Sequence, residues 1–143
     1  MQSKRSKCAY FTIYGKNIVE FFKKNGLQSG NKVKNNVQIP KWIKENLSFL
    51  KSCVKGLTDT DGCVYYISRK TNRNLRITFT NHASNLLKDY RDALIKLGFY
   101  PSKIIRGYDV FLSRKKDIEK YISEVGFSNS KNLKRITYFS SDR

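Results

Sequence analysis

Residues 49–64 read Phe49-Leu50-Lys51-Ser52-Cys53-Val54-Lys55-Gly56-Leu57-Thr58-Asp59-Thr60-Asp61-Gly62-Cys63-Val64. The pattern predicts an apolar helix that ends in two acids and then turns into a strand. A glycine inside a helix costs ~1 kcal/mol relative to alanine, and close approach of a second backbone is its usual compensation. We therefore expect a helix–helix contact at Gly56, and a turn with positive φ at Gly62.

The two acids, Asp59 and Asp61, stand where carboxylates contribute little to helix stability, because their charge opposes the helix dipole at the C-terminus. Carboxylates are, however, preferred ligands of hard divalent cations. We expect the turn to direct Asp61 out of the helix end, over the mouth of the following sheet.

The rest of the chain alternates between helical and strand patterns on both sides of this segment. The predicted elements are a strand at 9–14, a helix from Asn17 to Gly26, a polar linker at 28–37, a helical turn from Pro40, a helix at 48–58, strands at 64–70 and 74–80, a helix at 84–97, strands at 102–106 and 108–112, a last helix that ends at Gly126, and a basic tail. The order from 47 to 126 predicts an α+β domain of αββαββα type with a four-stranded antiparallel sheet.

An internal repeat links the two ends of the chain at a constant offset of 100 residues. It aligns Ile18 with Ile118, Phe21 with Tyr121, and Gly26 with Gly126. We interpret residues 1–46 as a partial repeat that contains the final strand and helix of a first domain copy. The complete domain then covers 47–130, and a basic tail covers 131–143. Chance similarity of two amphipathic strand–helix units is the alternative.

The charge of the chain indicates its partner. Its 143 residues contain 29 Lys and Arg against 11 Asp and Glu, a formal net charge of +18. Such an excess destabilises a compact state, and a polyanion relieves it with release of counterions. The basic residues are spread over predicted strands and loops instead of one amphipathic helix, which favours nucleic acid over a membrane surface.

The remaining composition indicates a reduced, intracellular environment, in the cytoplasm or an organelle matrix. The three cysteines are an odd number without metal-ligand spacing. The N-terminus lacks an apolar signal core, and no run approaches the ~20 apolar residues of a membrane span.

The segment from Val54 to Gly62 resembles the nine-residue motif of the LAGLIDADG homing endonuclease family. The matching positions are Gly56, Leu57, Asp59, Asp61 and Gly62, and the departures are Val54, Lys55, Thr58 and Thr60. The residues at 39–43 and the αββαββα order are also similar to the family.

The resemblance implies a Mg²⁺-dependent, site-specific endonuclease of double-stranded DNA. Two motif helices would pack side by side through Val54, Gly56 and Leu57, and each would deliver one acid to shared Mg²⁺ ions. A four-stranded saddle would read the DNA. Because this chain holds one motif, it would act as a homodimer or pair with a separate first half, and a two-fold axis would supply the second acid.

The resemblance also implies roles for single residues. Asp61 would be the metal ligand and catalytic acid, while Asp59 and Gly62 would be structural. The assisting basic residue best matches Lys116, with Lys115 next to it. The residue that organises water would be Asn81, His82 or Ser84.

The open face of the sheet should contact DNA, because polar residues alternate there with Leu75, Ile77 and Phe79. The expected DNA-binding residues are Tyr65, Arg69, Arg73, Asn74, Arg76, Thr78, Thr80, Lys103 and Arg106.

Two alternatives keep the fold and remove the cutting. The chain could be a nucleic-acid binder without nuclease activity, either an intron RNA maturase or a DNA-binding regulator. It could also be the C-terminal fragment of a two-motif endonuclease or intein, inert by itself.

Overall fold

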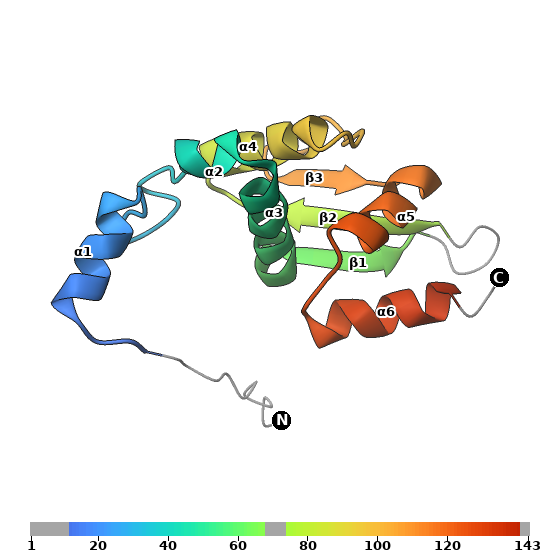
Figure 1. Ribbon diagram of the computed structural model, residues 1–143. Coiled ribbons are helices and arrows are strands. Elements are labelled where there is room, and N and C mark those ends of the chain that lie inside the picture. Colours follow the sequence, from blue (N-terminus) through green and yellow to red (C-terminus); the bar gives the residue numbers. More distant parts are fainter. Residues whose placement is uncertain (1–11, 68–73, 141–143) are drawn as a thin grey trace, which may run out of the picture.

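The computed structural model describes residues 12–67 and 74–140 (Figure 1). Its elements, in chain order, are α1 (Lys16–Lys24), α2 (Lys41–Glu45), α3 (Leu47–Asp61), β1 (Gly62–Tyr66), β2 (Leu75–Thr80), α4 (Ser84–Lys96), β3 (Asp109–Leu112), α5 (Lys115–Glu124) and α6 (Ser130–Ser140). The α+β class predicted from the sequence is therefore confirmed.

The sheet is antiparallel in the order β1-β2-β3. Leu75, Ile77 and Phe79 of β2 are buried, whereas the residues between them are partly exposed, as their alternation predicts. Helices α3, α4 and α5 cover the buried face and fill one core with it (Figure 1). The other face of the three strands carries the polar residues.

The strand expected at 102–106 is wrong: the described residues form three strands, and this segment contributes only an isolated bridge between Ile105 and Asp109. The backbone N–H of Ser102 donates to Phe111 O at 2.9 Å. In return, Phe111 N donates to the Ser102 hydroxyl at 3.1 Å instead of a backbone carbonyl. The serine side chain thus interrupts the ladder that a fourth strand would need.

The motif helix α3 is longer than the predicted 48–58. It begins after Asn46, whose side chain accepts hydrogen bonds from Ser48 N and Phe49 N, and it continues to Asp61. Both acids therefore lie in its last turn. The strand predicted at 64–70 ends at Tyr66, and its last three positions lie outside the described residues.

The segment expected as a basic tail forms α6, which packs beside β1 (Figure 1). Asn132 Oδ1 accepts from Val64 N at 3.4 Å, and Arg135 Nη1 donates to Val64 O at 2.7 Å. These side chains satisfy the backbone groups that β1, as an edge strand, would otherwise expose.

The N-terminal region packs least. No residue of α1 is buried, and residues 12–15 are not in a strand; the rest of the strand expected at 9–14 lies outside the described residues. The polar linker at 28–37 has no helix or strand, as predicted. Among the described residues, no helix is long and apolar enough to cross a membrane.

Candidate functional site

A buried hydrogen-bond network fixes the motif helix in the domain. The Thr58 hydroxyl accepts from Tyr121 OH at 2.8 Å and shares a hydrogen bond with Tyr90 OH at 2.9 Å. It also donates to Val54 O at 2.8 Å. Burial is the main cause that raises the pKa of both tyrosines, so each phenol stays protonated. The network joins α3 to α4 and α5 and sets where the last turn of α3 lies.

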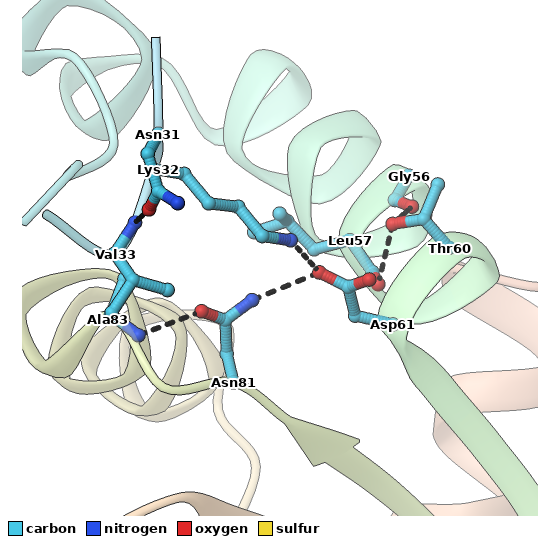
Figure 2. Close-up of polar contacts among 9 residues, drawn as sticks. All are labelled: Asn31, Lys32, Val33, Gly56, Leu57, Thr60, Asp61, Asn81 and Ala83. Carbon is cyan, nitrogen blue, oxygen red and sulfur yellow. Dashed lines mark hydrogen bonds and ion pairs between the residues drawn. The ribbon is translucent and has the colours of Figure 1, made fainter. Parts of the chain in front are cut away.

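Asp61 is the last residue of α3 and stands at one end of the sheet. Its Oδ2 accepts from Lys32 Nζ at 2.5 Å and from Asn81 Nδ2 at 2.9 Å. Figure 2 shows these two donors converging on the carboxylate from separate segments. The Asp61 side chain is 30% exposed, so the carboxylate is also open to solvent.

Asn81 follows β2 directly and is buried. Its backbone N–H donates to Tyr108 O at 2.9 Å, and its side-chain oxygen accepts from Ala83 N at 2.9 Å (Figure 2). The amide oxygen is therefore occupied by the start of α4, and the amide nitrogen faces Asp61. Asn81 thus presents a hydrogen-bond donor to the carboxylate.

The sequence does not predict Lys32 at this site. It comes from the polar linker, 29 residues before Asp61 in the chain, and its side chain is 51% exposed. The residue types around it are asparagines and lysines, which predict only a loop. No local sequence signal identifies this contact, because only the three-dimensional path of the linker creates it.

Asp59 makes different contacts from Asp61, although both lie in the same turn. Its carboxylate accepts from Ser128 N at 2.8 Å and from Asn129 N at 3.2 Å. Its backbone oxygen accepts from Asn129 Nδ2 at 2.9 Å. Asp59 therefore ties the end of α3 to the loop between α5 and α6, the kind of backbone contact expected of a structural acid.

Two other expected site residues lie near Asn81 in the chain but not against Asp61. His82 is exposed, and its ring centroid lies 5.2 Å from that of Tyr108. The Ser84 hydroxyl donates to Asn36 Oδ1 at 3.2 Å. Of the three residues that the resemblance implies for organising water, Asn81 is the one that contacts Asp61.

Lys116 is not brought to Asp61. In the sheet, Thr80 pairs with Asp109 at the end near Asp61, and Ile77 pairs with Leu112. Strand β3 therefore runs away from Asp61, and Lys115 and Lys116 begin α5 at the opposite end of the sheet (Figure 1). The expected catalytic pairing of Lys116 with Asp61 does not occur within this chain.

The exposed face of α3 differs in part from the expected helix–helix contact. Val54 is fully buried in the core, so it cannot take part in a contact with a second helix, and Leu57 packs partly against the same core. Gly56, in contrast, is exposed, and a Cβ built there meets nothing within 4 Å. Phe49, half exposed, lies on the same side two turns earlier.

The turn at Gly62 has a different basis from the one expected. Its φ is −99°, so positive φ is not required there. A Cβ at this position would instead collide with the backbone oxygen of Thr58. Glycine is needed because β1 leaves the helix end without room for a side chain, and this close passage places Asp61 at the mouth of the sheet.

The donor set of Asp61 can be compared with what Mg²⁺ requires. Carboxylate oxygen is a suitable hard ligand, but Mg²⁺ prefers octahedral coordination. Among the described residues, no group of three His, Cys, Asp or Glu side chains could hold a metal ion. Asp61 therefore fits Mg²⁺ as part of a site, with further ligands from a second chain, a phosphate or water.

The open face of the sheet holds most of the described residues expected to contact DNA. Tyr65 pairs with Arg76 across the strands, and the Thr78 hydroxyl donates to Tyr65 OH at 3.4 Å. The Arg76 guanidinium lies 3.9 Å over the ring of Phe111. The Thr80 hydroxyl donates to Asp109 Oδ1 at 2.6 Å. These contacts hold polar side chains in fixed positions on the face.

The other expected DNA contacts lie at strand ends and turns. Asn74 is exposed beside β2, and Lys103 and Arg106 are exposed before β3. Arg106 has φ of 54° and forms the tight turn with Gly107. Arg69 and Arg73 lie outside the described residues.

The chain was compared with known protein families and with curated proteins. The model of the LAGLIDADG-like domain matches residues 48–137, which is more than half of the chain. The match begins within α3 and extends into α6. No curated protein matches the chain.

Proposed function

The chain belongs to the LAGLIDADG-like domain family, and from this premise we propose that it is a site-specific, Mg²⁺-dependent endonuclease of double-stranded DNA. Membership of the family indicates a nucleic-acid function of the homing endonuclease or maturase type. The observation that carries the proposal is Asp61, a solvent-open carboxylate at the end of the motif helix, beside the polar face of the sheet.

The chemistry proposed for Asp61 needs a second acid. The described part of the chain presents one such carboxylate, whereas a cation held against a phosphodiester is best served by several oxygen ligands. A second motif helix packed on the open side of Gly56 would bring another acid to the same place, since a two-fold interface repeats each residue across its axis. The second helix comes from another copy of this chain or from a separate first half.

Different residues of the chain would bind the metal, position the carboxylate and contact the DNA. Asp61 would hold Mg²⁺, which when bound stabilises the attacking and leaving oxygens of the cut phosphodiester. Asn81 holds the carboxylate in place through its amide hydrogen bond. Arg76 and Tyr65 present donors on the sheet face, where an arginine can bind guanine with two hydrogen bonds and other contacts reach phosphates. The charge of +18 strengthens each backbone contact.

A second candidate keeps nucleic-acid binding and lacks cutting. It is favoured by the position of Lys116, because the basic residue expected beside the acid lies at the other end of the sheet. An intron RNA maturase or a DNA-binding regulator would need the basic polar face but not the lysine near Asp61. The same fold would then bind nucleic acid without cutting it.

Selection from a randomised DNA library separates the two candidates. The purified chain is incubated with the library in Mg²⁺ or in EDTA, and cut ends are captured and sequenced, with a preparation from cells lacking the chain as control. The nuclease proposal predicts a recurrent cut site in Mg²⁺ alone. Tight binding of DNA or of structured RNA with no cut ends in Mg²⁺ or Mn²⁺ would contradict it and support the binder.

A further inference from the structure

One side chain of the polar linker at 28–37 contacts the carboxylate of the site. Lys32 Nζ lies 2.5 Å from Asp61 Oδ2, the same oxygen that accepts from Asn81 (Figure 2). Within residues 12–67 and 74–140, this is the ion pair that the structure gives to Asp61. A lysine reaches the acid from a segment that sequence patterns assign to a loop.

The turn around Lys32 is built by its own hydrogen bonds. Asn31 Oδ1 accepts from Val33 N at 2.9 Å and from Lys34 N at 3.1 Å. Val37 N donates to Lys32 O at 3.1 Å. An asparagine side chain that accepts hydrogen bonds from backbone N–H groups two and three residues ahead stabilises a local turn. The backbone of Lys32 is therefore fixed within this turn.

Long-range contacts then fix the turn to the domain. Asn36 Oδ1 accepts from Ser84 Oγ at 3.2 Å and from Asn85 N at 3.0 Å, at the start of α4. Ile39 is buried in the core, and its N–H donates to Asp89 Oδ2 at 2.8 Å. The linker residues that follow Lys32 are thus attached to α4. The start of α4 lies close to Asn81 in the chain. The position of its ammonium follows from these attachments.

The distance to Asp61 determines what this ammonium can do. A group 2.5 Å from Oδ2 occupies a lone-pair direction in which a metal ion would bind. Ammonium and divalent cation therefore compete for this oxygen. The side chain of Lys32 is 51% exposed and its four-carbon stem is flexible, so it can move aside while its backbone stays fixed. Once displaced from Asp61, the ammonium can donate hydrogen bonds to a phosphate bound next to Asp61.

We propose that Lys32 is the basic catalytic residue of this site: it pairs with Asp61 while no metal is bound, and contacts the oxygens of the cut phosphodiester when a cation takes Asp61. The inference rests on the proposed function. In the reaction, the oxygen of water bonds to phosphorus, one P–O ester bond breaks, and the leaving oxygen gains a proton from that water. Lys32 donates hydrogen bonds to the non-bridging oxygens and transfers no proton.

The first test measures metal binding without DNA. Lys32→Met and the control Lys34→Met, an exposed lysine two residues away, are titrated with Mn²⁺ beside the wild type and Asp61→Asn. Removal of the competing ammonium should tighten Mn²⁺ binding by about threefold or more in Lys32→Met only, and Asp61→Asn should weaken it. Equal Mn²⁺ affinity of Lys32→Met and wild type would overturn the inference.

The second test measures cutting in a single turnover with saturating DNA and Mg²⁺. Loss of one charged donor to a transition state costs about 10²–10³ in rate, so Lys32→Met should fall by this factor. Lys32→Arg should recover part of the rate, Lys34→Met should keep all of it, and DNA affinity in EDTA should stay within about threefold. An unchanged rate in Lys32→Met, beside an inactive Asp61→Asn, would overturn the role of Lys32 alone. Wild-type cutting by Asp61→Asn would overturn the proposed function itself.

Discussion

Helices α1 and α5 match in sequence at an offset of 100 residues but differ in their surroundings. Ile118 and Tyr121 of α5 are 1% and 0% exposed, whereas Ile18 and Phe21 of α1 are 38% and 62% exposed. The two helices also occupy corresponding ranges, Lys115–Glu124 and Lys16–Lys24. The same apolar spacing therefore forms a helix in both places and is buried in one of them.

The two helices also end in the same way. Gly26 and Gly126 have φ of 89° and 69°, the left-handed conformation that glycine adopts most readily after a helix. The difference lies in what covers the apolar face. Helix α5 packs on β2 and hydrogen-bonds to α3. Among the described residues, no strand packs against α1 in this way. Local pattern thus fixes where a helix forms and stops, while burial depends on the rest of a unit. The interpretation of α1 as the end of a first domain copy stays a prediction.

Truncation of Tyr121 should have the largest effect on stability. The side chain is fully buried and packs against Phe99 and Phe127. Tyr121→Ala leaves a cavity and removes the hydrogen bond that Tyr121 OH donates to the Thr58 hydroxyl, so the free energy of unfolding should fall by about 3–5 kcal/mol. Denaturation in urea measures this change. A loss below about 1 kcal/mol would show that α5 is not packed as described.

The hydroxyl of Thr58 should have the next largest effect, because it joins α5 to α3. Thr58→Val leaves the Tyr90 and Tyr121 hydroxyls without their shared partner, at a cost of about 1–3 kcal/mol. The matched control is Thr60→Val on the exposed side of the same helix, whose hydroxyl bonds to Gly56 O and which should change stability by less than about 0.5 kcal/mol. Equal effects of both substitutions in urea denaturation would refute the buried network.

Alkaline pH should lower the free energy of unfolding, because Tyr121 of α5 and its neighbour Tyr90 are buried. Burial raises the pKa of Tyr90 and Tyr121 above the ordinary value near 10, so the folded chain retains protons that the unfolded chain releases. The contribution is complete below about pH 10 and declines as pH rises above that value. Stability measured between pH 8 and about 11.5 should fall above pH 10. Tyr121→Phe should reduce the slope and Tyr14→Phe, at an exposed position, should leave it unchanged; equal slopes in all three proteins would contradict this.

Truncation of Phe21 should have the smallest effect. Its side chain is 62% exposed, so Phe21→Ala should change the free energy of unfolding of the isolated chain by no more than about 0.5 kcal/mol, in contrast to its sequence counterpart Tyr121. The same urea denaturation measures both. A loss of more than about 2 kcal/mol would mean that α1 is covered in solution and that the contrast between the helices does not hold.

The features that the sequence predicts correctly are those that depend on short, local residue patterns. The apolar spacing of α3, the alternation of Leu75, Ile77 and Phe79, and the helix stop at Gly126 each depend on neighbouring residues. The position of Asp61 at the end of α3 follows from the same local information. Its role as a metal ligand stays a prediction.

The features that the sequence misses depend on contacts between distant segments. Lys32 reaches Asp61 only because the linker is fixed to α4. The sequence predicts Val54 at a helix–helix contact, but Val54 is buried in the core, because the sheet determines which side of α3 faces inward. The strand at 102–106 fails because one hydroxyl, that of Ser102, replaces a backbone acceptor. Periodicity carries none of this information.

The proposed nuclease function depends on Asp61 as the metal ligand, and the cleavage rate of Asp61→Asn tests this role most directly. On a site that the wild-type chain cuts in Mg²⁺, the single-turnover cleavage rate of Asp61→Asn should fall by about 10³ or more, with DNA affinity in EDTA unchanged, because the amide keeps the shape of the side chain and loses the charge that holds the cation. Cleavage by Asp61→Asn at the wild-type rate would contradict the account.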